Sequence, residues 1–484
     1  MTKATTADIV LDASALYNGN SLAEAFSKIP QAGTDTYTIT LAPGTYNVTG
    51  LTYKGTNTIK IVGTGTATYG TDVLIYGQGS DMTQEATRST LSFQGACNII
   101  LENLAIQNSY GTTEGTAQSE ALGISNTAFS GTLAAYNCAF LSGQDTICTE
   151  GKAWFYKCYV EGDVDFLWIE SRTGKVALYE ECILRAIGTR TTKAYFTAPR
   201  LAVANTVGKG VVIWNSTLQA EDGLKNVYLG RNPWDKETDE KKGTNYFNNY
   251  YEQVAIVGSK YYGSALNEAI WSGSGANGTE NQQFVGFKTD THFKASSSGI
   301  GARLTAEQVS AEYSSRNAIL NRVYNIAGGE FENDSSANIW DVAKTEAEFN
   351  VETSEALPET TFNATSAKVV WDLASEWTGD DGTTSSYQGK SGKVVGTIEG
   401  YDGNDYTVKM HVNAEKVNGT NGKFEAQQAN SRTQMNANTV ITVPVTDGAI
   451  VSVTTQSGKV LIEGSETNTY THSGIETGIV IYCT

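Results

Sequence analysis

The sequence predicts an all-β protein in two parts, a parallel β-helix followed by a separate β-sandwich. Composition gives the first observation, since the chain has 49 Gly but only 6 Pro, and Thr, Ser, Asn and Tyr dominate its polar positions. These residues favour strands joined by tight turns. The second observation is a short pattern that repeats at the spacing expected for the coils of a solenoid.

The repeated pattern is a β-rich run in which an aromatic residue stands two or three positions before a Cys or Ser. Its shared position falls at Cys138, Cys158, Cys182 and Ser216, which are 20, 24 and 34 residues apart. The segment NIILENLAIQNS from Asn98 has the same pattern. A β-helix stacks one position of each coil in rungs about 4.8 Å apart, whereas a β-sandwich would not keep a position in register at this spacing. We therefore expect a β-helix, with the three cysteines as a buried stack of small side chains.

Two helical segments accompany the predicted β-helix. Residues 21–30 (SLAEAFSKIP) predict a short amphipathic helix, with Leu22 and Phe26 on its apolar face. Such a helix would close the open end of the stack of coils. Residues 304–320 predict a second helical segment, which opens with capping-box spacing at Thr305.

The composition changes towards the C-terminus, where an acidic, Thr-rich stretch precedes a segment of different pattern. Within VITVPVTDGAIVSV, the apolar residues Ile441, Val443 and Val445 alternate with others, as expected for a strand with one buried face. We therefore expect three regions: a β-helix domain over 1–345, a linker over 346–366 and a β-sandwich module over 367–484.

Charge and composition exclude several function classes. Acidic residues number 52 against 34 basic ones, and the formal net charge of -18 argues against a nucleic-acid partner. No apolar run of about 18 residues occurs, so we expect no membrane span. The three histidines, His292, His411 and His472, lie in no hydrolase or zinc motif, and the six cysteines lack metal-type spacing. Carboxylates are then the expected acid–base groups.

Two aspartates stand at matching positions of consecutive predicted coils. Asp145 follows Cys138 by seven residues, and Asp165 follows Cys158 by seven. Their carboxylates would project from adjacent rungs about 5 Å apart. Because like charges that close cannot both ionise at little cost, one pKa should rise while the other stays low, which gives an acid and a nucleophile or base. The alternative is that both are turn residues of a solenoid.

Four motifs resemble those of one enzyme family. GQDT (residues 143–146) and EGDVDF (161–166) closely resemble two signature segments of the pectin methylesterases, which are right-handed parallel β-helix carbohydrate esterases. YLGRNPW (228–234) resembles a third, LGRPW, and QSEAL (118–122) resembles QAVAL. With SLAEAF, LAPGTYN and LTAEQV in matching order, the resemblance covers about the first 345 residues.

The resemblance implies a role for each of five polar residues. Asp165 would attack the methyl-ester carbonyl of a galacturonate unit to form an acyl-enzyme, and Asp145 would protonate the departing methanol. Gln118 and Gln144 would donate N–H groups to the oxyanion. Arg231 would pair with Asp165 and keep it ionised. The scheme requires no metal and no cofactor.

The resemblance also implies sugar contacts, and the motifs depart from the family pattern beside two of them. Trp234 would present a flat face to a sugar ring, and Phe166 and Trp168 follow the nucleophile. The family sequence DFIFG is replaced by DFLWI, so that Trp168 is either an added sugar contact or a core residue. The third motif has an extra Asn232, which should leave Arg231 in place but displace Trp234.

The C-terminal segment more loosely resembles modules appended to bacterial pectin-degrading enzymes. Exposed aromatic residues there would stack on sugars, whereas buried ones would fill the core and leave a stabilising role. The candidates are Trp371, Trp377, Tyr387, Tyr401 and Tyr406.

The sequence thus predicts a pectin-active enzyme. We expect a secreted monomer that acts on methyl-esterified pectin and whose signal peptide has been removed, because the N-terminus MTKATTADIV has no apolar core of a signal sequence. Since de-esterified pectin is a polyanion, the negative charge of the protein favours highly methylated substrate. The alternatives are another β-helix enzyme, such as a Ca²⁺-dependent lyase or a polygalacturonase, and a non-catalytic pectin-binding protein.

Overall fold

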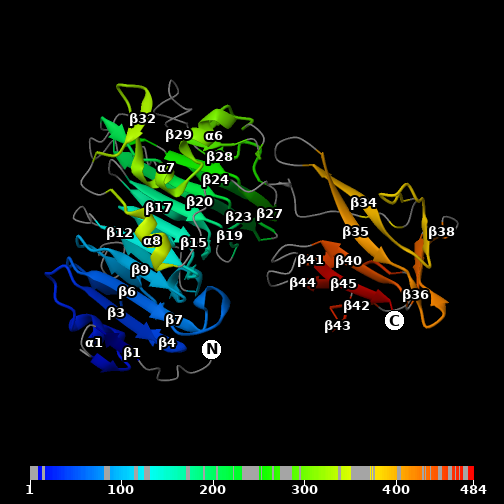
Figure 1. Cartoon of the computed structure of the whole chain (residues 1–484), viewed down its shortest axis with the longest axis horizontal. Coiled ribbons are helices and arrows are strands. Elements are labelled where there is room, and N and C mark those ends of the chain that lie inside the picture. The colour runs from blue at the N-terminus through cyan, green and yellow to red at the C-terminus, as the bar shows by residue number, and fades with distance from the viewer. Residues whose placement is uncertain are drawn as a thin grey trace. The chain divides into compact units, whose positions relative to one another are not determined.

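The computed structural model divides into two compact units, Met1–Asn363 and Ala364–Thr484 (Figure 1). The residues that the structure describes are 9–12, 17–80, 88–113, 118–124, 131–170, 175–188, 191–202, 205–221, 223–231, 250–251, 253–263, 266–272, 286–290, 292–293, 296–335, 339–349, 371, 373, 377–399, 405–427, 430, 432–436, 438–444, 450–455, 460–463, 465–467, 469–471 and 478–483.

The first unit is a right-handed parallel β-helix, which confirms the predicted fold class (Figure 1). Among the described residues, its coils form a first sheet of 12 strands, a second of 8 and a third of 9. The first sheet has the order β2 (Tyr17–Gly19), β1 (Ile9–Asp12), β3 (Thr36–Leu41), β6 (Thr58–Gly63), β9 (Ile99–Glu102), β12 (Thr132–Tyr136), β15 (Lys152–Tyr156), β18 (Val176–Glu180), β22 (Gly210–Trp214), β26 (Gln253–Val257), β29 (Gly286–Thr289) and β30 (Ala302–Arg303).

The other two sheets repeat the same stacking in the opposite order of listing. The second sheet consists of β27 (Lys260–Gly263), β23 (Thr217–Ala220), β19 (Ile183–Ala186), β16 (Tyr159–Gly162), β13 (Ala139–Leu141), β10 (Ala105–Asn108), β7 (Val73–Gly77) and β4 (Gly44–Asn47). The third consists of β28 (Trp271–Ser272), β24 (Asn226–Arg231), β20 (Lys193–Ala202), β17 (Val164–Glu170), β14 (Ile147–Thr149), β11 (Leu122–Ile124), β8 (Leu91–Phe93) and β5 (Leu51–Tyr53), with β25 (Tyr250–Tyr251) beside β20.

The predicted stack of small side chains lies at the corner between the first and second sheets. Cys158 N donates to Cys182 Sγ at 3.4 Å, Cys182 N to Ser216 Oγ at 3.0 Å, and Ser216 N to Ser259 Oγ at 3.1 Å. Cys138 begins this stack and, like Cys158 and Cys182, is buried as a free thiol. The sequence repeat and the coil register therefore coincide, as predicted.

Helices cover the first sheet and one end of the stack. The predicted N-terminal helix is α1 (Leu22–Ser27), which buries Leu22 and Phe26. The segment expected as one helical stretch forms two helices, α6 (Ala306–Glu312) and α7 (Arg316–Asn321). The predicted capping box opens α6, and a second cap divides the segment because Ser315 Oγ accepts the N–H of Ala318. None of the described helices has the length and apolar character needed to cross a membrane.

A further helix, α8 (Val342–Glu348), occupies the first residues of the expected linker. Phe349, which follows α8, is buried against Trp154 and Tyr136, with ring centroids 5.9 and 5.4 Å away. The stretch from 350 to 370 lies outside the described residues. The first unit therefore packs as far as Phe349.

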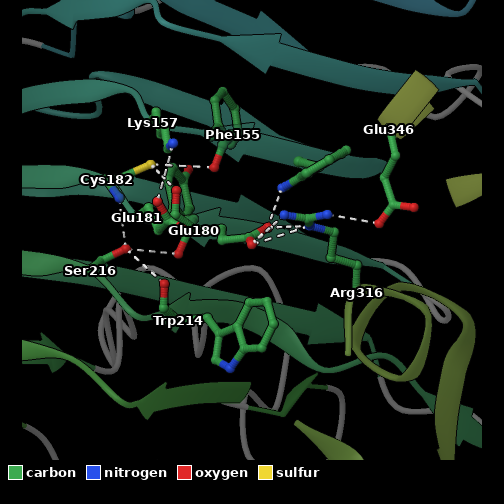
Figure 2. Close-up of polar contacts among 11 residues, drawn as sticks. Phe155, Lys157, Glu180, Glu181, Cys182, Trp214, Ser216, Arg316 and Glu346 are labelled. Atoms are coloured by element: carbon green, nitrogen blue, oxygen red, sulfur yellow. Dashed lines mark hydrogen bonds and ion pairs between the residues drawn. The ribbon is translucent and has the colours of Figure 1, made fainter. Parts of the chain in front are cut away.

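A buried ion-pair network fixes these helices to the first sheet (Figure 2). Arg316 of α7 donates from Nε and Nη2 to Glu180 of β18, at 2.8 Å in each case, and from Nη1 to Glu346 of α8 at 2.8 Å. Trp154 Nε1 donates to Glu180 Oε2 at 2.8 Å. Arg316 and Glu180 are fully buried, so their charges stabilise the fold only while the whole network is intact. We call these four residues the tether network.

The second unit is built of antiparallel sheets and forms the predicted β-sandwich. Its largest sheet has the order β34 (Ser391–Glu399), β35 (Asp405–Asn413), β40 (Val440–Pro444), β45 (Gly478–Cys483), β42 (Val460–Ile462) and β43 (Ser465–Glu466). A second sheet pairs β33 (Ser386–Gln388), β38 (Lys423–Gln427) and β39 (Arg432–Met435). Ile441 and Val443 of β40 are buried, as the alternation predicted, and Val445 lies outside the described residues.

Two of the candidate sugar-binding aromatic residues are part of the core of this unit. Trp377 and Tyr387 are buried and stack on one another with ring centroids 5.3 Å apart. Trp371 is half-buried and packs against the same core. The expectation of exposed rings is therefore wrong for Trp377 and Tyr387, because the small sandwich uses its large aromatic side chains to fill its interior.

Candidate active site

The two predicted aspartates lie at equivalent positions of consecutive coils, at the corner between the second and third sheets. β14 and β17 pair in parallel with Ile147 opposite Leu167, so Asp145 and Asp165 stand at the same offset before their strands. The backbone N–H of Asp145 donates to the carbonyl of Val164 at 3.0 Å. The spacing argument from the sequence is therefore confirmed.

Both aspartates have a left-handed backbone, with φ of 60° at Asp145 and 55° at Asp165. This conformation is uncommon for residues other than glycine, and Asp tolerates it better than most. At Asp165 the register of β17 against β20 shifts by one residue between Val164 and Leu167. Such a bulge turns a side chain out of its regular direction and is frequent beside active sites.

Gly162 allows the two turns to approach one another. A Cβ at this position would lie 2.3 Å from Phe166 Cβ, 2.5 Å from Thr146 Oγ1 and 2.6 Å from the carbonyl of Gly143. Only glycine fits there without moving one of the two aspartate turns. The glycine in EGDVDF thus has a packing reason.

Arg231 forms a bidentate ion pair with Asp165. Its Nε and Nη2 donate to the two carboxylate oxygens at 2.6 Å each. Arg231 ends β24, two strands from β17, and its guanidinium lies over the ring of Tyr195 of the intervening strand β20, 4.7 Å from the ring centroid. The predicted Arg231–Asp165 pair is present, and Tyr195 is a neighbour that the sequence did not indicate.

The surroundings of the two carboxyl groups differ in charge. Burial raises the pKa of Asp145 well above its usual range, and the neighbouring carboxylates of Asp165 and Glu120 raise it further. Burial also raises the pKa of Asp165, but the two hydrogen bonds and the charge of Arg231 oppose that rise. Asp165 is therefore the group of the pair that ionises first, while Asp145 keeps its proton. Among the described residues, nothing hydrogen-bonds to Asp145 Oδ2, although this atom is buried.

Gln118 and Gln144 both lie beside Asp145 and are half-buried. Gln118 precedes β11 in the coil before that of Asp145, and its side chain hydrogen-bonds to the Asp145 carboxyl. Gln144 directly precedes Asp145, and its carbonyl accepts the N–H of Ser119 at 3.2 Å. The structure therefore brings all five predicted polar residues into one corner of the β-helix.

The aromatic predictions have three outcomes. Phe166 is fully buried and packs on Phe196 inside the β-helix, with ring centroids 5.1 Å apart. The predicted sugar contact is wrong for Phe166, because its side chain points into the core. Trp168 is half-buried, and Trp234, with the inserted Asn232, lies outside the described residues.

Two charged residues of the site were missed in the sequence. Glu120, at the centre of QSEAL, is fully buried and pairs with Arg88, whose guanidinium also lies 5.7 Å from the centre of the Trp168 ring. Arg200 lies over the same ring at 6.0 Å. The signal for Glu120 was the acidic residue in place of the apolar Val of QAVAL. Nothing local marked Arg88, which is far from it in sequence.

This arrangement provides the parts of an acyl-transfer site. It holds an ionised carboxylate oriented by an arginine, a buried carboxylic acid beside it, and amide groups nearby that can donate to an oxyanion. Within the described part of the chain, no group of three or more His, Cys, Asp and Glu side chains is arranged to hold a metal ion.

Comparisons with known proteins agree with these motifs. A family model described as Pectinesterase matches residues 8–239. Pectinesterase 31 of Arabidopsis thaliana is 26% identical over 242 residues, which cover 44% of this chain and 65% of the relative. The chain thus spans just under two thirds of that relative's length.

Among solved structures, similar chains include pectin methylesterase PemA from Erwinia chrysanthemi and the pectin methylesterase from Aspergillus niger. The first is 17% identical, with 64% of this chain and 95% of that chain covered at a TM-score of 0.44. The second is 21% identical, with 54% and 78% covered at a TM-score of 0.39. Through the family model and its ordered motifs, residues 8–239 of this chain form a domain of the pectinesterase family.

Proposed function

We propose that the chain hydrolyses the methyl esters of galacturonate units in pectin and releases methanol and pectate. The bidentate Arg231–Asp165 pair beside the buried acid Asp145 is the observation that supports this proposal. Ester hydrolysis without a histidine needs one carboxylate that attacks and one carboxylic acid that protonates. A binding protein needs neither.

In the proposed first step, an Asp165 oxygen attacks the ester carbonyl carbon and a tetrahedral oxyanion forms. Amide N–H groups of Gln118 and Gln144 would stabilise this oxyanion. The intermediate then collapses, the bond to the methoxy oxygen breaks, and Asp145 gives its proton to that oxygen. Methanol leaves, and the galacturonyl group remains on Asp165 as an anhydride.

In the second step, a water molecule attacks the galacturonyl carbon of this anhydride. The Asp145 carboxylate takes a proton from the water, and Asp165 departs as a carboxylate paired with Arg231. The products are a free galacturonate carboxyl group and the enzyme in its starting protonation state. Arg231 would lower the energy of both the attacking and the departing carboxylate.

The proposal is tested by methanol release from highly methylated pectin with purified wild type and Asp165→Asn. We expect the variant to fold normally and to lose at least about 10³-fold in kcat, since the nucleophile is gone. Asp163→Asn is the matched control, because Asp163 lies two residues earlier, and its Oδ1 accepts the N–H of Val164 at 2.6 Å, which Asn can also do. The control should keep its rate within about 10-fold.

Other outcomes would favour other functions. Equal methanol release by both proteins would place the nucleophile elsewhere. New reducing ends or unsaturated products, without methanol, would indicate a polygalacturonase or a lyase. Binding to pectin without any product would indicate a non-catalytic pectin-binding protein.

We further propose that highly methylated pectin is the preferred substrate. The net charge of -18 should repel the polyanionic product, and salt should weaken that repulsion. Rates on pectins of high and low methylation, compared across ionic strength, test this preference. Equal rates on the two substrates at low salt would count against it.

The remaining proposals concern the setting of the enzyme. We propose a secreted monomer, a sugar contact through Trp168 and Trp234, and pectin binding by the second unit. Sedimentation of the purified protein tests the monomer, and fractionation of the source cells tests secretion. For the second unit, we would compare retention on insoluble pectin of the full chain and of a chain ending at Asn363. Equal retention would leave the second unit with a stabilising role.

A further inference from the structure

A buried ion pair lies directly behind Gln118. Glu120 is fully buried and Arg88 is only 8% exposed. Arg88 Nε lies 2.7 Å from Glu120 Oε1 and donates to Oε2 at 2.9 Å, and Ser89 Oγ donates to Oε2 at 3.3 Å. Because a buried charge without a partner is strongly unfavourable, each of these two side chains holds the other in place.

A single buried amide fixes the backbone of both residues. Asn108 Nδ2 lies 2.9 Å from the carbonyl of Arg88 and 3.1 Å from the carbonyl of Glu120. The two strands that carry the pair are thereby joined next to Gln118. The position of the Arg88 guanidinium is thus set by backbone, side chain and charge together.

The guanidinium determines which way the Gln118 amide faces. Arg88 Nη1 donates to Gln118 Oε1 at 2.7 Å. Since the oxygen and the NH₂ group of a carboxamide point apart, this contact directs the NH₂ away from Arg88, and the same side chain hydrogen-bonds to Asp145.

Without Arg88, the opposite orientation of the amide would be just as favourable. A protonated Asp145 can donate to Gln118 Oε1 as well as accept from Nε2. That flipped state would hold the catalytic proton on the amide oxygen and turn both N–H donors away from the ester. By occupying Oε1 with a donor, Arg88 excludes it.

We propose that Arg88, held by Glu120, is a positioning residue that fixes the Gln118 amide with its N–H donors towards Asp145 and the reacting ester. Its effect on the reaction rests on the proposed esterase function. Neither residue touches the substrate, and both act through Gln118.

The test is a mutant cycle in full-length protein. The variant Arg88→Met/Glu120→Leu removes both charges together, so no buried ion is left alone and the fold should be retained. We expect kcat to fall about 10- to 100-fold, the effect of losing one charge-assisted hydrogen bond, while KM changes less than about 3-fold. In a Gln118→Ala background, the same pair of substitutions should lower kcat by less than about 2-fold, because the residue through which Arg88 acts is gone.

Two further proteins protect the test from loss of folding. Arg88→Lys keeps the charge opposite Glu120 but cannot contact both Glu120 and Gln118 with the planar fork of an arginine, so it should show the same fall in kcat. Lys152→Met/Asp334→Leu is the matched control, because this pair is also buried, with 2.8 Å between Lys152 Nζ and Asp334 Oδ2. The control should keep the wild-type kcat.

A measurement without substrate separates this proposal from the proposed function. In ¹⁵N-labelled wild type, the Gln118 side-chain NH₂ signals, assigned by their absence in Gln118→Ala, should shift as Asp145 titrates. In Arg88→Met/Glu120→Leu that shift should be lost. If wild type releases no methanol but shows this difference, the esterase proposal fails and the positioning role stands.

Two results would overturn the positioning role. One is an NH₂ shift that is unchanged when the pair is removed. The other is a fall in kcat that is as large in the Gln118→Ala background as in wild type, since the pair would then act independently of Gln118.

Discussion

The tether network and the active-site corner use similar groups for opposite ends. Glu180 receives hydrogen bonds from Arg316 and Trp154, and Glu346 accepts from the remaining arm of Arg316. In the active-site corner, Asp145 is equally buried, but its Oδ2 has no hydrogen-bond partner in the described part of the chain. Both regions place carboxylates beside arginines inside the same β-helix.

The difference shows how one fold separates stability from chemistry. A buried carboxylate whose oxygens are all satisfied holds helices to a sheet and has nothing left to react with. A buried carboxyl next to two other carboxylates keeps its proton at a pH where free aspartates are ionised, which is unfavourable for folding but useful for general acid catalysis. Substitutions in the two regions should therefore change different quantities.

The largest effect is expected for Asp145→Asn, in which kcat should fall about 10²- to 10⁴-fold, the usual contribution of a general acid. Its stability should rise at neutral pH. Because the folded-state pKa of Asp145 is raised, its contribution to stability is present at acid pH and is lost as pH increases through that pKa.

Tm measured at pH 4 and pH 8 checks the stability part of this prediction. The variant should gain on wild type at pH 8 and much less at pH 4. A variant that is less stable than wild type by the same amount at both pH values would mean that Asp145 is not a strained acid.

Next in size is Arg316→Met, which leaves the Glu180 carboxylate buried with only Trp154 as a donor. Breaking a buried pair from one side costs about 3–5 kcal/mol of unfolding free energy, and kcat of the folded fraction should not change. Chemical denaturation and methanol release measure the two quantities.

The chain offers a matched control for Arg316→Met on the neighbouring residue of the same strand end. Glu181 pairs with Lys157 at 3.6 Å, and both side chains are exposed (Figure 2). Lys157→Met should cost less than about 1 kcal/mol. Equal losses in the two variants would show that burial does not distinguish these pairs.

The smallest effect is expected for Arg231→Lys. A lysine is a point charge and cannot reproduce the two parallel hydrogen bonds to Asp165, so kcat/KM should fall about 10- to 100-fold. Arg231 lowers the pKa of Asp165, and its weaker substitute should let that pKa rise.

The pH–rate profile checks the sign of this change. Asp165 must be ionised and Asp145 protonated, so the rising limb at acid pH reflects Asp165 and the falling limb reflects Asp145, as macroscopic values of a coupled pair. In Arg231→Lys the rising limb should move to higher pH. A shift to lower pH would contradict the proposed role of the arginine.

The sequence by itself determined the features that repeat or that lie close together along the chain. The Cys138–Cys158 spacing matched the coils, and from it followed the alignment of Asp145 with Asp165, because a solenoid converts a constant offset in sequence into adjacency in space. The family motifs supplied Arg231 as the partner of the nucleophile.

Only the tertiary structure decided the contacts between residues far apart in sequence, and which side chains face inward. Arg88 and Glu120 are brought together by coil stacking, and Phe166 turns into the core. No local pattern encodes these outcomes, because they depend on how bulges and neighbouring coils direct each side chain. Polarity alone marked Glu120 as unusual, and only packing showed that its charge is matched by Arg88 and lies beside Asp145.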